Sequence, residues 1–558
     1  MRGRIWIVFS GIILFYVCVV LRLFYWQVIR SPQLKSEAAS QHFFRFDLPA
    51  TRGSIFSSDG YPIVMNQEAY LVYAEPPHVK DMYDLTRRVG EILGVDSASI
   101  SAQIDQSGKL WAPIQHKVEV EKVEKLRALK IEGLGFEPEP KRYYPEASMA
   151  AHMLGFVGLD QNGMDKGYFG LEGYYDRELR GKDGSLRIEK DVKGNPILIG
   201  QTYRVDPEDG RNLILWMDRS IQGIVERRLR EGIEKYGAKE GTVTVMDPKT
   251  GGILAMASFP SYDPRSYTTY DKELYSNPSV AKSYEPGSTF KAIVMATGIY
   301  AGVITSKTTM EETGPVEVGG YQIRTWNSQY NGTVTMTDVL KHSSNVGMVF
   351  VGDKLGKEKL LGMIKDFGFG KLTGIDLEDE SSPEIRGDKE WYAIDLATAS
   401  FGQGIAVTVL QMLRAVGAIA NGGYIVEPHM VKAFSDKNGK VYPIPVKKIR
   451  QVLDKKSTEE ITEMMVTAVD EGEAKWAKPK GYRIAGKTGT AQIPVAGHYD
   501  DKKTIASFVG FAPADDPKFV MLVTLRETTS SQWGSETAAP LFFNIAKDLF
   551  LYWGIPAK

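Results

Sequence analysis

The sequence predicts an α+β protein with a single N-terminal transmembrane helix, a region of mixed helices and strands, and a C-terminal domain with a central antiparallel sheet covered by helices. An apolar run begins at Ile5, the pattern changes near residue 212, and the chain beyond has strands at both ends with helices between them. A chain of 558 residues is too long for one ordinary domain. We therefore expect an anchor at residues 1–30, an N-terminal domain at 31–211 and a C-terminal domain at 212–558.

The N-terminal run from Ile5 to Leu21 contains no charged residue, and Leu23 to Trp26 extends it beyond Arg22. Its length is at the lower limit for a spanning helix, roughly 17–25 residues. No A-x-A-like cleavage site follows closely, which favours an uncleaved anchor over a signal peptide. Basic residues flank the run on both sides, so charge alone leaves its orientation open.

Residues 31–211 combine short extended runs with two stretches of helical spacing, Val79–Leu93 and Val118–Leu129. Prolines at 138, 140 and 145 predict loops. We find no catalytic set in this region.

From residue 212 onward, the pattern is one of strands and helices with clear start and stop signals. We expect a helix from Ser220 to Tyr236, opened by Asp218, and a helix from Val407 to Ile419, ended by Asn421-Gly422-Gly423. The expected strands are Leu213–Met217, Thr242–Met246, Ile253–Ala257, Arg483–Ala485, Ala506–Phe511 and Phe519–Leu525.

Composition excludes several classes of function. The formal net charge is −1, so no overall attraction draws the chain to nucleic acid. The single cysteine, Cys18, excludes an intramolecular disulfide, a thiolate zinc cluster and a C-x-x-C redox pair. The seven histidines show no metal-ligand spacing. We therefore expect no metal and no organic cofactor.

Three short strings carry the chemistry: Ser288-Thr289-Phe290-Lys291, Ser343-Ser344-Asn345 and Lys487-Thr488-Gly489-Thr490. In this order they form the set S-x-x-K, S-x-N and K-T-G of serine acyl transferases. Two similar strings are expected to be irrelevant. Lys249-Thr250-Gly251 lies in a turn between two apolar runs, and Ser279-Val280-Ala281-Lys282 has no matching helix start. Ser288, in contrast, follows Pro286-Gly287 and precedes an apolar run, as at a helix N-terminus.

The residue types suit acyl transfer. Ser288 needs a base, and Lys291, three residues on, would share its helix face. Burial and a second cation, for which Lys487 is the candidate, would favour neutral Lys291. Ser343 would relay a proton, and Asn345 would hold Lys291 or the substrate amide. The alternative, in which Ser288 only caps a helix and Lys291 is solvated, explains each residue alone but not the ordered set.

The third string would bind substrate. The backbone N–H groups of Ser288 and Thr490 would form an oxyanion hole, since the first N–H groups of a helix lack internal partners. The hydroxyls of Thr488 and Thr490, on either side of Gly489, would bind a substrate carboxylate.

The chain resembles the class B penicillin-binding proteins, which are peptidoglycan DD-transpeptidases. The strings that carry the resemblance are Arg52-Gly53-Ser54-Ile55, Arg142-Tyr143-Tyr144-Pro145, Gly170-Leu171-Glu172-Gly173, the run Tyr284–Lys291, Phe401-Gly402-Gln403-Gly404, the run Ala485–Gln492 and the run Phe508–Pro513. Trp326-Asn327 followed by Ser343-Ser344-Asn345-Val346-Gly347 is similar to the division (septal) branch. The elongation branch usually carries Asp in the middle of the second motif.

The resemblance implies that residues 31–211 form an elongated pedestal for dimerisation or partner docking below a penicillin-binding transpeptidase domain. It implies a single-pass protein of the bacterial inner membrane with its catalytic domain outside the cytoplasm. Ser288 would cross-link stem peptides that end in D-Ala-D-Ala, and β-lactams would acylate it. The implied partners are a polytopic glycosyltransferase of the shape, elongation, division and sporulation family and other divisome proteins.

Other functions remain open. An elongation-specific or sporulation-specific transpeptidase would carry the same motifs. A β-lactamase would need a base for deacylation, of which no signature is seen, and a β-lactam sensor would need several membrane spans. A scaffold with a relict site is disfavoured because the motif residues are intact.

Overall fold

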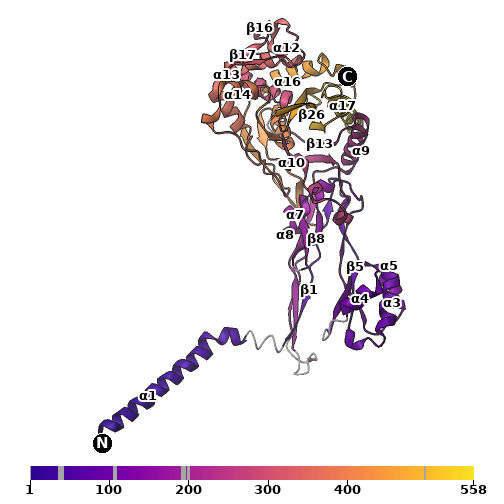
Figure 1. The fold of residues 1–558 in the computed structure, drawn as a ribbon, viewed down its shortest axis with the longest axis vertical. Coiled ribbons are helices and arrows are strands. Elements are labelled where there is room, and N and C mark those ends of the chain that lie inside the picture. The colour runs from indigo at the N-terminus through magenta and orange to yellow at the C-terminus, as the bar shows by residue number, and fades with distance from the viewer. Residues whose placement is uncertain are drawn as a thin grey trace. The chain divides into compact units, whose positions relative to one another are not determined.

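The computed structural model describes residues 2–35, 43–104, 110–161, 163–189, 197, 202–495 and 498–557 (Figure 1). The chain forms two compact units. The first unit comprises Met1–Gly53 with Arg180–Gly210, and the second comprises Ser54–Leu179 with Arg211–Lys558. The α+β fold predicted from the sequence is confirmed. The boundary between residues 211 and 212 stays a prediction.

The first unit contains the apolar helix α1 (Arg2–Phe24), which continues as a π-helical turn, η1 (Tyr25–Ile29). Together they are long and apolar enough to cross a membrane. The unit also contains a three-stranded antiparallel sheet of β1 (Phe43–Leu48), β10 (Gly184–Glu189) and β11 (Thr202–Val205).

A small α/β layer with its own apolar core lies in the second unit. Its sheet has the order β5 (Ala112–Glu119), β4 (Ala69–Ala74), β6 (Leu134–Pro138), and its helices are α3 (Met82–Leu93), α4 (Ser97–Ile104) and α5 (Val120–Ala128). Both predicted helices are present. The expectation of loops at the prolines is only partly right, because Pro138 ends β6, where it pairs with Tyr70.

A six-stranded sheet has the order β23 (Val441–Pro443), β22 (Val431–Ser435), β12 (Asn212–Leu215), β2 (Ile55–Phe56), β3 (Pro62–Gln67), β7 (Lys141–Tyr143). β12 ends two residues before the predicted limit at Met217. It pairs in parallel with β2 and antiparallel with β22. Segments from residues 55–143, 212–215 and 431–443 therefore meet in one sheet.

The predicted central sheet is five-stranded and antiparallel, in the order β14 (Ile253–Phe259), β13 (Glu240–Met246), β27 (Phe519–Arg526), β26 (His498–Ala512), β25 (Ala485–Val495). Alternate residues of β27 face two cores: Val520 and Leu522 enter one, Met521 and Val523 the other. Because side chains alternate along a strand, this pattern shows that both faces are covered.

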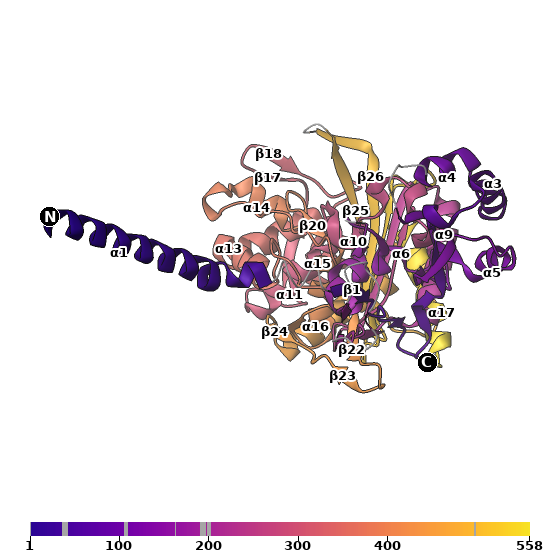
Figure 2. The same ribbon diagram turned by 90° about the horizontal axis from the view of Figure 1, so that it is seen from below.

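Helices cover the two faces of this sheet (Figure 2). One core contains residues of α9 (Arg219–Tyr236) and α17 (Ala538–Tyr552). The other contains residues of α11 (Lys291–Tyr300), α13 (Asn345–Asp366), α15 (Val409–Ala420) and α16 (Lys455–Asp470). The expected opening of α9 is confirmed, since the Asp218 carboxylate accepts hydrogen bonds from the N–H groups of Ser220 and Ile221.

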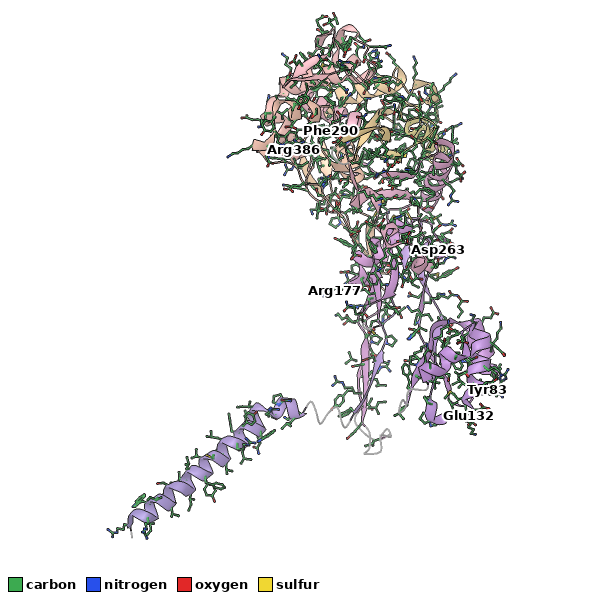
Figure 3. The ribbon with its side chains drawn as sticks, in the orientation of Figure 1. Tyr83, Glu132, Arg177, Asp263, Phe290 and Arg386 are labelled. Carbon is green, nitrogen blue, oxygen red and sulfur yellow. The ribbon has the colours of Figure 1, made fainter. Side chains whose placement is uncertain are left out.

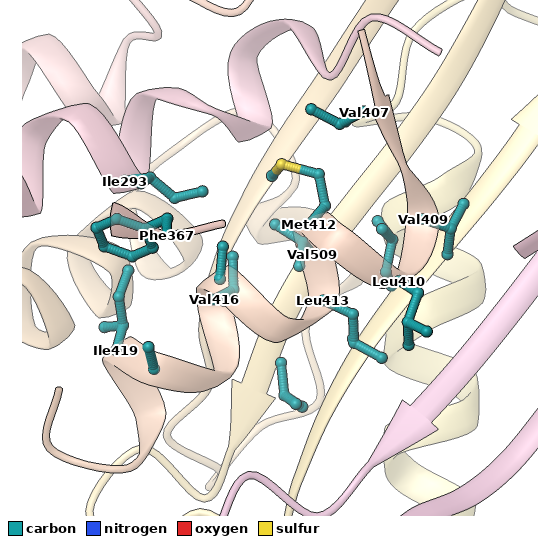
Figure 4. Close-up of a cluster of buried hydrophobic side chains, with 14 of the residues drawn as sticks. Ile293, Phe367, Val407, Val409, Leu410, Met412, Leu413, Val416, Ile419 and Val509 are labelled. Atoms are coloured by element: carbon teal, nitrogen blue, oxygen red, sulfur yellow. The ribbon is translucent and has the colours of Figure 1, made fainter. Parts of the chain in front are cut away.

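Helix α15 is apolar on nearly all sides and buried; Val416 and Ile419 point toward Ile293 and Phe367, and Val509 of the sheet lies in the same cluster (Figure 4). It begins two residues later than predicted, because Val407 and Thr408 form strand β20. A reciprocal capping box between Thr408 and Gln411 fixes this start. Val407 pairs with Tyr284, four residues before Ser288, so this helix start supports the segment that carries Ser288.

Of the two strings expected to be irrelevant, one has the predicted local structure and the other does not. Lys249-Thr250-Gly251 forms the predicted turn between β13 and β14. Ser279 lies on the short helix α10 (Pro278–Ala281), so the expectation of no helix start there was wrong. Asn277 caps α10 by accepting a hydrogen bond from the Ser279 N–H, and Pro278 occupies its first turn.

Candidate active site

Ser288 lies on a short 3₁₀ turn, η5 (Gly287–Thr289), that leads directly into α11. The predicted helix N-terminus is therefore present, although the first α-helical residue is Lys291. The side chain of Phe290, labelled in Figure 3, is fully buried and anchors the turn. Gly287 has a φ of +54° and donates its N–H to the carbonyl of Gly402 at 3.0 Å. The positive φ favours glycine at this position, immediately before the nucleophile candidate.

Lys291 is fully buried, and its side-chain nitrogen contacts the second motif. Nζ donates to the carbonyl oxygen of Ser343 at 2.6 Å, to Oδ1 of Asn345 at 2.7 Å and to Oγ of Ser343 at 3.3 Å. Three acceptors hold the amine in one place. The tertiary fold thus joins the first and second motifs through this lysine.

The second motif forms the turn between α12 (Met336–Lys341) and α13. Ser343 has a φ of +55°, an uncommon conformation for a residue with a side chain. Ser344 caps α13 by accepting from the N–H of Gly347 at 2.9 Å, and its hydroxyl donates to the buried Glu312 carboxylate. Asn345, the first residue of α13, donates its amide to the carbonyl of Arg324 at 3.0 Å. Its Oδ1 is thereby directed toward Lys291.

The third motif lies on β25, the edge strand of the central sheet. Gly489 packs closely against η5: a Cβ atom there would lie 2.5 Å from Oγ of Ser507 and 2.8 Å from Cγ2 of Thr289. A side chain at this position would push the edge strand away from Ser288. The Thr490 hydroxyl accepts from the N–H of Gly534 at 3.0 Å, so its own proton can be donated to a ligand.

Lys487 is 3% exposed and donates to the hydroxyl of Thr488 at 3.1 Å. Burial lowers the pKa of Lys487 to about 8. Burial, and then the charge of Lys487, lower the pKa of Lys291 well below its usual value. The charge of Glu473 opposes these shifts, because it raises the pKa of both lysines. A base at Lys291 is therefore available at lower pH than a solvated lysine would allow.

A pocket of about 440 Å³ joins the three motifs. Its lining includes Ser288, Ser343, Asn345, Thr488, Gly489 and Thr490. Lys291 and Lys487 are buried behind it. The similar strings lie elsewhere: Ser279 is buried with its hydroxyl accepting from Thr244, and Lys249 pairs with Asp516. Every predicted site residue is thus in or directly behind one pocket.

Sequence analysis assigned no role in the site to several residues of the pocket wall. Trp326, Phe401, Gln403 and Gln492 lie in strings that carry the family resemblance, whereas Glu473, Thr504, Gln532, Trp533 and Ser535 lie outside those strings. The rings of Trp326 and Trp533 lie edge to face with centroids 5.1 Å apart, although the residues are distant in sequence. Gly402 lies between Phe401 and Gln403 of the pocket wall, and a Cβ atom there would lie 2.1 Å from the carbonyl oxygen of Gly287. Glu473 carried no recognisable motif.

No set of three or more His, Cys, Asp or Glu side chains suited to a metal ion occurs within the described residues. The pocket instead offers hydroxyls, amides and aromatic rings around a serine with a buried lysine. This chemistry suits acyl transfer to and from Ser288.

Two family models match the chain. Residues 241–547 match the penicillin binding protein transpeptidase domain, and residues 47–215 match the penicillin-binding protein dimerisation domain.

Curated relatives are similar over almost the whole chain. Stage V sporulation protein D of Bacillus subtilis is 33% identical over 98% of this chain and 85% of its own length. The probable peptidoglycan D,D-transpeptidase PenA of Neisseria gonorrhoeae is 29% identical, covering 98% of this chain and 92% of the relative. The peptidoglycan D,D-transpeptidase FtsI of Escherichia coli K12 is 29% identical, covering 95% and 89%.

Solved structures share the fold. A peptidoglycan synthetase from Bifidobacterium adolescentis has a TM-score of 0.76 at 25% identity, covering 92% of this chain and 98% of that one. Penicillin binding protein 2X from Streptococcus thermophilus has a TM-score of 0.76 at 25% identity, covering 92% and 81%.

Proposed function

Because this chain belongs to the class B penicillin-binding proteins and is a membrane-anchored peptidoglycan D,D-transpeptidase, we propose that Ser288 is its nucleophile and that it cross-links stem peptides of the septal wall. One observation carries the assignment of the nucleophile. Lys291 is fully buried, bound to Ser343 and Asn345, and lies one helical turn beyond Ser288, which opens into the pocket.

In the first half-reaction, neutral Lys291 takes the proton of Ser288, and Oγ attacks the carbonyl carbon between the two D-Ala residues. The N–H groups of Ser288 and Thr490 stabilise the tetrahedral oxyanion. Ser343, 3.3 Å from Lys291 Nζ, relays the proton to the departing D-Ala amine as the C–N bond breaks. The ester to Ser288 remains.

In the second half-reaction, the neutral amine of another stem attacks this ester. The new C–N bond forms, the C–O bond to Ser288 breaks, and Oγ regains a proton through Lys291. The hydroxyls of Thr488 and Thr490 hold the donor's terminal carboxylate during acylation. Each hydroxyl already accepts a hydrogen bond, from Lys487 and from Gly534 respectively, so each has its proton to give.

The assignment is tested with a fluorescent penicillin and mass spectrometry. Ser288→Ala is expected to abolish covalent labelling while the thermal transition is preserved, since the side chain is small and partly exposed. Ser279→Ala, which alters the other S-x-x-K string, is the matched control and is expected to label normally. Label on another serine of the Ser288→Ala protein would refute the assignment.

The septal role is supported by the similarity to FtsI and by Trp326-Asn327 together with Ser343-Ser344-Asn345. The similarity to stage V sporulation protein D favours a sporulation role as the second candidate. Depleting the protein from its host separates these roles: a septal enzyme leaves filaments with blocked septa. Normal division with defective spores would favour the second candidate, and rounded cells with normal septa an elongation role.

We place the catalytic domain outside the cytoplasmic membrane, because the stem peptides are cross-linked there. A separate polytopic glycosyltransferase of the shape, elongation, division and sporulation family would supply new glycan strands within the divisome. The apolar span Ile5–Leu21 and residues 31–211 are the proposed docking surfaces. Replacing them with the equivalent segments of an elongation-type relative is expected to abolish co-purification with the septal glycosyltransferase, whereas unchanged co-purification would exclude these surfaces.

A further inference from the structure

Glu473 carries the one acidic or basic side chain among the described residues that line the active-site pocket. The others are hydroxyl, amide, aromatic or glycine residues. The two catalytic-site lysines lie behind the wall and are almost fully buried. A ligand that enters the pocket therefore meets the charge of Glu473 directly.

The backbone on both sides of Glu473 is fixed. Gly472 and Ala474 are buried while Glu473 is exposed. A Cβ at Gly472 would lie 2.1 Å from the carbonyl oxygen of Ala468, so this segment packs tightly after α16. The fold thus presents Glu473 to the pocket from a well-supported position.

The carboxylate of Glu473 has no hydrogen bond or ion pair with any described residue. Its charge nevertheless reaches the catalytic site, because it raises the pKa of both Lys291 and Lys487 against the effect of burial. A free carboxylate would repel the donor's terminal carboxylate, which the Thr488 and Thr490 hydroxyls hold. It would attract a cation, as would the faces of Trp326 and Trp533 on the same pocket wall.

We propose that Glu473 binds the ammonium group of the acyl acceptor and so sets the preference of this enzyme for a cationic amine over water. The inference rests on the proposed acyl-transfer function at Ser288. Binding itself breaks no covalent bond. Before attack, the ammonium gives one proton to solvent, and the neutral nitrogen then displaces Ser288 Oγ from the acyl carbon.

The test uses the full-length protein in detergent with a D-alanyl thioester donor and two acceptors. An N-acetyl-lysine amide is protonated at neutral pH, whereas hydroxylamine is largely neutral there. Glu473→Gln is expected to raise KM for the lysine acceptor about five- to tenfold, the scale of one charge-assisted contact in a partly exposed site. KM for hydroxylamine is expected to change by less than about twofold. Glu473→Asp is expected to restore part of the difference.

Glu471→Gln is the matched control. It removes the same charge two residues before Glu473, and the Glu471 side chain does not line the pocket. This variant is expected to leave KM unchanged for both the lysine acceptor and hydroxylamine. Equal changes for the two acceptors in Glu473→Gln, or none, would overturn the role of Glu473 while leaving the Ser288 assignment intact. Wild-type protein that is never acylated by donor or penicillin would instead refute the proposed function, and this inference with it.

Discussion

At the scale of single residues, the two buried lysines depend on each other. Lys291 must be neutral to act as a base, and the nearby charge of Lys487 helps to make it so. Lys487 is itself buried, which lowers its pKa to about 8. In the proposed mechanism the active form has one neutral and one charged lysine, an arrangement that exists over a limited range of pH.

We expect penicillin acylation to follow a bell-shaped pH profile. The rate rises as pH increases through the lowered pKa of Lys291, because the neutral amine is the base. It falls above about pH 8, where Lys487 loses its charge. Lys487→Met removes the like charge, so the rising limb is expected to move to higher pH. Initial labelling rates across the pH range measure both limbs.

The control for this profile is Lys249→Met, which alters the lysine of the other K-T-G string. Lys249 is paired with Asp516 and does not line the active-site pocket. Its profile is expected to match that of the unaltered protein. A rising limb that stays in place in Lys487→Met would contradict the electrostatic coupling.

At the scale of elements, close backbone contacts set the position of Ser288. The edge strand β25 approaches η5 through Gly489, and the segment after α14 (Ala393–Ala399) approaches it through Gly402. The N–H of Gly287 bonds to Gly402, and the N–H of Gly404 bonds to Glu285 at 3.1 Å. The turn that carries Ser288 is therefore held between two segments distant in sequence.

Gly402→Ala tests this support. Gly402 has a φ of +82°, and an added Cβ would meet the Gly287 carbonyl oxygen at 2.1 Å. We expect at least about a tenfold loss of acylation rate and about 1–3 kcal/mol of lost stability. Gly422→Ala is the control: its φ is +84°, but nothing lies within 4 Å of its Cβ. It is expected to lose about 1 kcal/mol and to retain acylation. Equal acylation losses would contradict a local effect.

A buried ion pair joins two other elements. Nε of Arg142 on β7 lies 2.6 Å from Oε1 of Glu172 on α7 (Gly170–Tyr174), and the side chains are 5% and 0% exposed. Glu172→Gln would leave a buried guanidinium without its counter-charge. We expect about 3–5 kcal/mol of lost stability, measured by denaturant unfolding in detergent.

The control for the buried pair is Glu121→Gln, which breaks an exposed pair with Lys125 on α5. An exposed pair of this kind is screened by solvent and contributes much less to stability than a buried pair. Equal losses in the two variants would mean that burial does not strengthen the Arg142–Glu172 contact.

At the scale of the whole molecule, all the residues that line the active-site pocket belong to the compact unit that contains the five-stranded sheet. The apolar helix belongs to the other unit. The three motifs lie far apart along the chain and meet because α11, α13 and β25 pack around one pocket. None of the described residues of α1 lines that pocket.

Removing residues 1–30 is therefore expected to release the protein from membranes without abolishing penicillin labelling. The comparison is between membrane and soluble fractions of cells that express each form. The acylation rate of the truncated protein is expected to lie within about twofold of the full-length rate, because every residue that would touch the ligand is retained. A folded but unlabelled truncated protein would show that the anchor contributes to the site.

The sequence by itself determined features that depend on local patterns. The apolar run identified the membrane helix, helical spacing and caps located α3, α5 and α9, and the ordered motifs predicted candidate residues that the fold brings together at one pocket. Even Ser288 and Ser279, which share the S-x-x-K pattern, were separated by flanking residues, although α10 was missed because its cap at Asn277 was not recognised.

Only the tertiary structure decided features that depend on atoms distant in the chain. The parallel pairing of β12 with β2, the burial of Lys291, the contact of Trp326 with Trp533 and the position of Glu473 in the pocket belong to this class. The physical reason is that desolvation and Coulomb interactions depend on what surrounds a group in space. A motif specifies a lysine, and the packed fold around Lys291 lowers its pKa well below that of a solvated lysine.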